Sequence, residues 1–129
     1  MSSIPKELRY TKDHEWVRES DDPQVVEVGI TDYAQGVLGD VVFVELPKSA
    51  AGFKQHDVFG TIEAVKAVSE LFAPVAGTIL ETNKALEQDP ALVNRDPYGK
   101  GWMIKVKLDK PNELDEALSA DQYKEFVVE

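Results

Sequence analysis

Short segments in which apolar and polar residues alternate recur along most of this chain. A period of two residues is typical of β-strands, because successive side chains point to opposite faces of a sheet. Turn-forming residues separate the segments. The segments cover residues 15–18, 25–30, 41–46, 58–64, 68–72, 78–82 and 102–108. This pattern predicts a mainly β protein, built as a sandwich or a flattened barrel.

One short helix is predicted between the second and third of these strands. Thr31 or Asp32 is placed to cap its beginning, and Gly39 is placed to end it. Its apolar face would consist of Ala34, Val37 and Leu38.

Two further short helices are predicted after Pro111. Asn112 would cap the first, and Ser119 with Gln122 has the pattern of a capping box for the second. The inward residues would be Leu114, Ala117 and Leu118 in the first helix, and Tyr123, Phe126 and Val127 in the second. We expect these helices to cover an open end of the sheets and protect an edge. Residues 87–101 contain two Asp-Pro steps and are expected to form a surface loop, with one helical turn at 90–94.

A faint internal repeat relates two halves of the chain. Residues 39–44 resemble residues 77–82, at a separation of 77 minus 39, or 38 residues. Residues 60–65 resemble residues 101–106, at a separation of 101 minus 60, or 41 residues. The repeat favours a sandwich of two related halves, although Gly before an apolar run is common at strand starts.

One lysine, Lys66, lies midway between the predicted strands 58–64 and 68–72, which would form a hairpin. A turn with positive φ at both central residues would strain the branched side chain of Val65, so we expect a tight type I turn. Ala64 and Ala67 are small and would let another protein approach the lysine amine. An exposed lysine is usually only a solvated surface residue, but one at a hairpin tip is also suited to acylation.

The composition is that of a globular protein with one domain. Hydrophobic residues make up 43% and charged residues 29% of the 129 residues, which is sufficient for a single core. The chain has no cysteine, and this excludes disulfides, thiolate nucleophiles and zinc–thiolate sites. Any thiol chemistry would therefore have to come from a cofactor.

The chain is strongly acidic, with 14 Lys and Arg against 24 Asp and Glu and a net charge of −10. This charge would repel a phosphate backbone, so we expect no nucleic-acid partner. The acidity either keeps the protein soluble or steers it toward basic patches on partner enzymes. No targeting segment or membrane span is recognisable, so no membrane association and a cytoplasmic location are expected.

The sequence gives little support to catalysis or metal binding. It contains two histidines and lacks a nucleophile elbow, a phosphate loop and a histidine-rich metal motif. Asp13, His14 and Glu15 are consecutive in a strand-like segment, where neighbouring side chains point to opposite faces, so they are poorly placed to hold one metal. His56 is expected in an exposed turn before the lysine strand. We therefore expect neither an enzyme nor a metal site.

Four segments carry a family resemblance. Glu63, Val65, Lys66 and Ala67 are followed by APVAG at 73–77, and HEWV lies at 14–17. GITDYAQ at 29–35 precedes LGDVVFVEL at 38–46, and DPY at 96–98 precedes GWMI at 101–104. Together and in this order, the segments resemble the glycine cleavage system H proteins, which are lipoyl carriers of the biotinyl/lipoyl-domain type.

The resemblance implies a single lipoyl-carrier domain over residues 1–129, with a lipoyl-type core at about 25–108 and a helical cover at about 112–127. The implied fold is mainly β, a flattened barrel and sandwich hybrid with a lysine-bearing hairpin, one short internal helix and short C-terminal helices. Lipoate would be attached to Lys66 by an amide bond, with Glu63, Val65 and Ala67 as the attachment context. No catalytic residue is implied.

By the same resemblance, lipoate on Lys66 would accept an aminomethyl group from glycine after decarboxylation by glycine decarboxylase, the P protein. A tetrahydrofolate-dependent aminomethyltransferase, the T protein, would remove the group, and dihydrolipoyl dehydrogenase, the L protein, would reoxidise the arm. A lipoate ligase or lipoyl transferase would attach the lipoate. We expect the carrier to be a monomer.

The resemblance also implies a cleft that holds the loaded arm against the protein. An acidic side chain in that cleft would stabilise the cationic aminomethyl group. Glu15 and Glu70 match the acidic positions that line the cleft in the family, and Glu70 is one methylene longer than the Asp often found there.

Three alternatives remain at this stage. The first is a lipoyl relay that donates its lipoate to 2-oxoacid dehydrogenases. The second is a biotin carrier, in which the lysine usually lies between two methionines where this chain has Val65 and Ala67. The third is an unmodified β-sandwich binding module.

Overall fold

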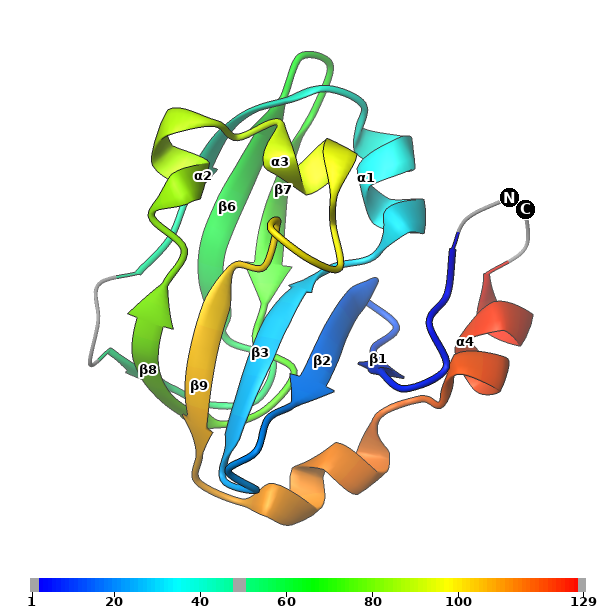
Figure 1. Cartoon of the computed structure of the whole chain (residues 1–129), viewed down its shortest axis with the longest axis vertical. Helices are drawn as coiled ribbons and strands as arrows, with labels where there is room; N and C mark the ends of the chain where they lie inside the picture. Colours follow the sequence, from blue (N-terminus) through cyan, green and yellow to red (C-terminus); the bar gives the residue numbers. More distant parts are fainter. Residues whose placement is uncertain (1–2, 48–50, 128–129) are drawn as a thin grey trace.

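The computed structural model describes residues 3–47 and 51–127 and consists of two antiparallel sheets with short helices around them (Figure 1). The strands are β1 (Arg9–Tyr10), β2 (Glu15–Glu19), β3 (Val25–Ile30), β4 (Val41–Glu45), β5 (Gly52–Phe53), β6 (Val58–Ala64), β7 (Val68–Phe72), β8 (Gly77–Thr82) and β9 (Ile104–Leu108). The helices are α1 (Asp32–Leu38), α2 (Ala85–Gln88), α3 (Leu92–Arg95), the 3-10 helix η1 (Pro111–Glu116) and α4 (Ala120–Phe126). The large sheet has the order β1-β2-β3-β9-β8-β5, and the small sheet has the order β4-β6-β7.

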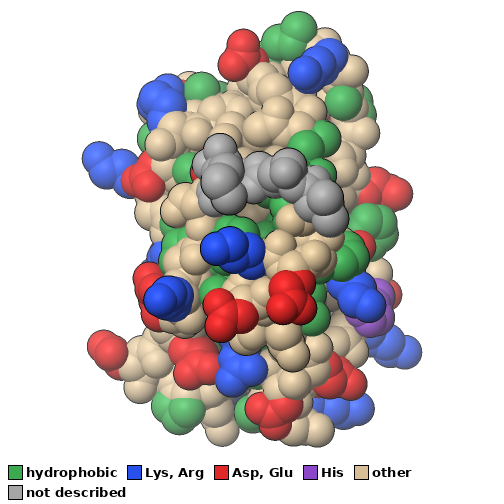
Figure 2. All heavy atoms as spheres, turned by 90° about the vertical axis from the view of Figure 1, so that its right-hand side faces the viewer, with side chains coloured by type: hydrophobic (Ala, Val, Ile, Leu, Met, Phe, Trp, Pro, Cys, Tyr) green, Lys and Arg blue, Asp and Glu red, His purple; other side chains and the backbone are tan. Residues whose placement is uncertain are grey.

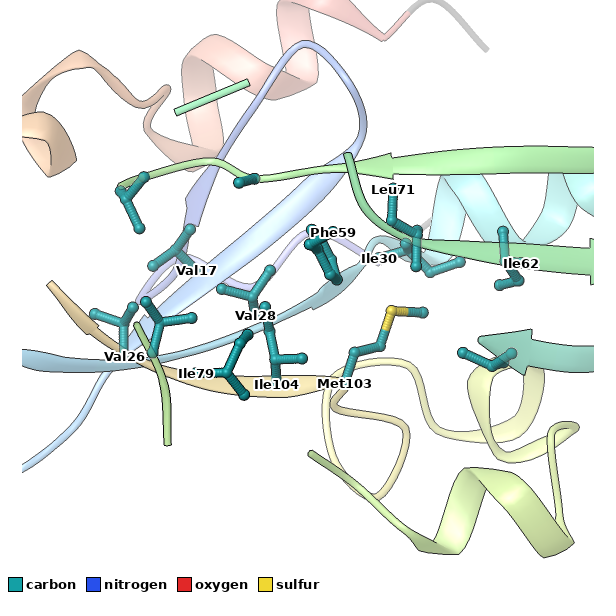
Figure 3. Packing of buried hydrophobic residues seen from close by; sticks show 14 of the residues in the cluster. Val17, Val26, Val28, Ile30, Phe59, Ile62, Leu71, Ile79, Met103 and Ile104 are labelled. Atoms are coloured by element: carbon teal, nitrogen blue, oxygen red, sulfur yellow. The ribbon is translucent and has the colours of Figure 1, made fainter. Parts of the chain in front are cut away.

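The core lies between the two sheets. Val28, Ile62 and Ile104 are completely buried and come from both layers. Figure 3 shows their side chains converging in one continuous cluster with Met103. Because each strand contributes every second side chain to this cluster, the alternation in the sequence is the direct record of the sandwich.

The predicted fold class is confirmed. The bounds predicted for 25–30, 58–64 and 68–72 match β3, β6 and β7, while the last strand begins at Ile104 rather than at residue 102. β1 and β5 were not predicted, because two residues are too few to show an alternation. They pair only with the edges of β2 and β8.

The internal repeat has a structural counterpart. β4 pairs with β6 and β8 pairs with β9, and each pair contains one register shift. The shifts lie between Val41 and Phe43 and between Ile79 and Glu81, a separation of 79 minus 41, or 38 residues. The partner strands repeat at 104 minus 62, or 42 residues, since Ile62 pairs with Val44 and Ile104 with Thr82. The second separation of 41 predicted from sequence was therefore wrong by one residue.

Two helix ends were predicted correctly from their capping residues. The Thr31 hydroxyl accepts a hydrogen bond from the N–H of Ala34 at the start of α1, and Gly39 ends α1 with a φ of 83°. Ser119 and Gln122 form the expected capping box of α4. Each cap satisfies helix-end backbone groups that would otherwise lack a partner.

Three helix predictions need correction. The segment after Pro111 is a 3-10 helix capped by Lys110, not by Asn112, because the fixed φ of proline suits the first helical position. Phe126 is exposed by 43% and packs beside the rings of His14 and Tyr123 instead of entering the core. α2 was not predicted at all, and the predicted turn at 90–94 is displaced to α3.

The C-terminal segment covers the free edge of the large sheet. Tyr10 in the edge strand β1 exchanges two backbone hydrogen bonds with Leu118, and its ring stacks on Tyr123 of α4 at 4.7 Å. On the face shown in Figure 2, acidic and basic side chains are interspersed rather than separated into patches of one sign. Within residues 3–47 and 51–127, the structure has no helix of the length and hydrophobicity that a membrane span requires.

Candidate functional site

Lys66 lies at the tip of the β6–β7 hairpin, which projects beyond the surrounding helices in Figure 1. Glu63 pairs with Val68, and the N–H of Ala64 donates to the carbonyl of Ala67 at 2.7 Å, so the loop contains only Val65 and Lys66. Neither residue has a positive φ. This excludes the turn types I′ and II′ and agrees with the expectation drawn from the branched side chain of Val65.

The tip is open to solvent. Lys66 and Ala67 are exposed, Val65 is exposed by 75% and Val68 by 70%. Lys66 forms no ion pair with any residue in the described part of the chain. Its amine is therefore accessible to a modifying enzyme, with two valine side chains next to it that an enzyme could cover.

Glu63 is exposed on the strand that leads to the tip, and Ala64 beside it is buried. The predicted attachment context therefore divides into an inward part that fixes the hairpin and an outward part, Glu63, Val65 and Ala67, that surrounds the lysine. No observation in the structure assigns a role to these three residues, and their part in attachment stays a prediction.

A cleft of about 210 Å³ opens between α1 and the edge strand β7. Its apolar wall includes Ile30, Val37, Leu38 and Leu71. Its polar groups come from the start of β2 and from β7, and they are Asp13, His14, Glu15, Ser69 and Glu70. The structure thus brings together Glu15 and Glu70, which are far apart in the sequence, on one cleft beside the lysine hairpin.

Glu15 lies at the inner end of the cleft and is only 2% exposed. One carboxyl oxygen, Oε2, accepts a hydrogen bond from the backbone N–H of Phe72 at 2.7 Å. The other oxygen, Oε1, is buried without a hydrogen-bond partner among the described residues. Burial raises the pKa of the Glu15 carboxyl well above its ordinary value, the charge of Asp13 adds to this, and the Phe72 N–H opposes it.

Glu70 differs from Glu15 in its environment. It is exposed and lies opposite Thr61 in the β6–β7 pair. The cleft therefore has a buried carboxyl group at Glu15 and a solvated carboxyl group at Glu70. Their assignment to the aminomethyl group remains a prediction.

His14 is a cleft residue whose contacts the sequence did not predict. It has a φ of 66°, and its Nδ1 lies 2.8 Å from the hydroxyl of Tyr123, which also forms a hydrogen bond with the hydroxyl of Thr31. Burial lowers the pKa of the His14 imidazole, and the nearby charge of Asp13 opposes this shift. Tyr123 is 109 residues away in the chain, so no local signal could have revealed this link.

The structure agrees with the predictions made for metals and for His56. The described residues contain no group of His, Cys, Asp and Glu side chains that could hold a metal ion. His56 is exposed in the turn before β6, where it has a φ of 73°.

The comparison with known proteins is decisive for the family. The family model described as "Glycine cleavage H-protein" matches residues 8–129. The chain belongs to the glycine cleavage H-protein family. It is therefore a lipoyl-carrier subunit of the glycine cleavage system and not a catalyst.

Individual relatives cover nearly the whole chain. The glycine cleavage system H proteins of Staphylococcus carnosus and Chlorobium limicola are 53% and 54% identical to it over 127 residues, which cover 98% of this chain and 99% of each relative. The crystal structure of a glycine cleavage system H protein from Mycobacterium marinum is similar with a TM-score of 0.86 and 39% identity. The match covers 95% of this chain and 97% of that one.

The site is compatible with a lipoyl group. Lys66 offers an accessible primary amine for an amide bond, and the adjacent cleft has an apolar wall against which a hydrocarbon arm could pack. At the inner end of this cleft, the unpartnered oxygen of Glu15 could accept a hydrogen bond from a polar or cationic group. The residues of this chain therefore fit the cofactor that the family implies.

Proposed function

We propose that this chain carries lipoate in amide linkage on Lys66 and shuttles an aminomethyl group from glycine decarboxylase to a tetrahydrofolate-dependent aminomethyltransferase. Dihydrolipoyl dehydrogenase would then reoxidise the arm. The observation that supports this proposal best is the exposed amine of Lys66 at the tip of a two-residue loop, in a chain of the H-protein family. A lipoate ligase or lipoyl transferase attaches the cofactor, and we place the monomeric carrier in the cytoplasm with these partners.

The cofactor supplies a cyclic disulfide that accepts a group at one sulfur and is later restored by oxidation. The chain supplies the support. The paired strands β6 and β7 hold the base of the arm, and the small side chains beside Lys66 leave room for partner enzymes. Formation of the amide removes the positive charge of the lysine, which favours packing of the arm against apolar surface.

The cleft supplies protection for the cationic and water-labile aminomethyl group. Val37, Leu38 and Leu71 would exclude water from one side of it. Glu15 would accept a hydrogen bond on its free oxygen and, once ionised, stabilise a positive charge. Glu70 would act as a second, more solvated carboxylate at the same cleft.

Intact-mass measurement after incubation with lipoate and a lipoate ligase tests the attachment site. The unmodified chain and the control variant Lys54→Arg should each gain one lipoyl group, whereas Lys66→Arg should gain none, because a guanidinium is not acylated in the same way. The substitution lies at an exposed tip and should change the free energy of unfolding by no more than about 0.5 kcal/mol. Lipoylation of Lys66→Arg at another residue, or its failure to fold, would contradict the proposal.

A further inference from the structure

The tip of the lysine hairpin rests on the segment that joins α1 to β4. The backbone N–H of Val65 donates to the carbonyl of Asp40 at 3.0 Å. Next to this bond, Val41 pairs with Ala64. The base of the loop is therefore held from outside the hairpin, by residues 39–41.

The side chain of Lys66 lies against the same segment. A methyl group built on Gly39 would come within 2.9 Å of Cε of Lys66, so the glycine leaves the space that the lysine stem occupies. Gly39 has a φ of 83°, a conformation that favours glycine. It directly follows Leu38, which lines the cleft. The lysine stem thus runs along the end of α1 at which the cleft begins.

One side chain, that of Asn94 in α3, holds this segment on both sides of Asp40. Its Oδ1 accepts the N–H of Val41 at 2.9 Å, and its Nδ2 donates to the carbonyl of Gly39 at 2.8 Å. Nδ2 also donates to Oε1 of Gln35 at 3.0 Å. The carboxamide group therefore fixes the two peptide groups between which the acceptor for Val65 lies. Figure 1 shows α3 next to α1, below the hairpin tip.

We propose that Asn94 is a positioning residue for Lys66. By holding the segment 39–41, it fixes the acceptor of the Val65 N–H and the seat of the lysine stem, and so sets the point and direction from which the arm leaves the protein. The functional part of this inference rests on the proposed attachment of lipoate to Lys66. Precise placement of a reacting group from a supporting side chain is a general requirement of sites that several enzymes must engage.

The variant Asn94→Asp tests the inference. It keeps the size of the side chain and the acceptor for Val41 but loses both N–H donors, and it places an oxygen against the carbonyl of Gly39. Asn83→Asp is a matched control, because Asn83 is also buried and donates to two carbonyls, those of Lys100 and Trp102, both at 2.7 Å. Those carbonyls lie outside the segment that supports the hairpin tip.

Two measurements distinguish positioning from general stability. Hydrogen exchange of the Val65 amide, measured by NMR on the unmodified protein, should be about tenfold faster or more in Asn94→Asp and within about twofold of wild type in Asn83→Asp. The kcat/KM for lipoylation by a purified lipoate ligase should fall about fivefold or more in Asn94→Asp only.

Unchanged exchange at Val65 in Asn94→Asp, or equal acceleration in Asn83→Asp, would overturn the inference, as would lipoylation of Asn94→Asp at the wild-type rate. If Asn94→Asp does not fold, Gln35→Ala takes its place, because it removes one partner of the Asn94 amide. It should accelerate exchange at Val65 by a smaller factor, and no acceleration would overturn the inference. Because exchange is measured without lipoate, absence of lipoate from Lys66 would refute the proposed function and leave this measurement interpretable.

Discussion

The carboxyl group of Glu15 accepts a hydrogen bond from the backbone N–H of Phe72 at 2.7 Å. Glu15 begins β2 in the large sheet, and Phe72 ends β7 at the edge of the small sheet. The bond therefore links the two sheets at the inner end of the cleft. Because it satisfies only one of the two buried oxygens, the group that closes the cleft is also its most strained polar group.

The pH dependence of stability should reveal this burial. Since burial raises the pKa of Glu15 in the folded state above its ordinary value of 4.5, the folded protein holds a proton that the unfolded chain has released. The contribution of Glu15 to stability is thus fully present below that ordinary value and is lost as the pH rises through the folded-state pKa. Urea denaturation at a series of pH values measures it.

The neutral isostere Glu15→Gln should remove this contribution. Its free energy of unfolding relative to wild type should increase with pH across the window above 4.5, by at most about 1.4 kcal/mol per pH unit. A difference between the two proteins that stays constant with pH would show that Glu15 titrates normally and is not desolvated.

A pair of glycine substitutions should have opposite effects on stability. In Gly77→Ala the new methyl group would lie 2.3 Å from the carbonyl oxygen of Lys107, so the β8–β9 backbone must shift, at a cost of about 1–3 kcal/mol. Gly36 lies in α1 with nothing within 4 Å of the new group, so Gly36→Ala should stabilise by about 0.5–1 kcal/mol. Urea denaturation of both variants decides it. Equal destabilisation would contradict the packing seen around Gly77.

The capping box of α4 should be worth a measurable part of the stability. Ser119→Ala removes the acceptor for the N–H of Gln122, at a cost of about 1 kcal/mol. Gln122→Ala leaves that bond and removes only the reverse one, from the N–H of Ser119, so it should cost less. The same order in thermal unfolding would confirm the cap, and the reverse order would show that the glutamine side chain matters more.

The hairpin could be predicted from the sequence because its determinants are local. Val65 restricts the turn type, alternation defines β6 and β7, and the residues around Lys66 carry the family resemblance. The caps at Thr31 and Ser119 were found for the same reason, since a cap and its partner lie three residues apart.

The surroundings of the lysine could not be predicted, because they depend on residues far apart in the chain. Asn94 supports the segment at 39–41 from 53 to 55 residues away, and Glu15 meets Phe72 across 57 residues. Neither contact leaves a periodic pattern in the sequence. Phe126 was misplaced for a related reason: its spacing fits an inward face, but the rings of His14 and Tyr123 hold it at the surface.

The two cleft carboxylates should contribute unequally to retention of the aminomethyl group. Lipoylated protein loaded from glycine by the decarboxylase, without tetrahydrofolate, should release ammonia about fivefold faster or more in Glu15→Gln, because a buried acceptor is weakened where water cannot replace it. Glu70→Gln should accelerate release less, since solvent screens an exposed charge. Glu125→Gln on α4 is the control for loss of an exposed acid, and all three variants should be lipoylated like the wild type. Release from Glu15→Gln at the wild-type rate would remove Glu15 from this role, even if its pH-dependent effect on stability were found as expected.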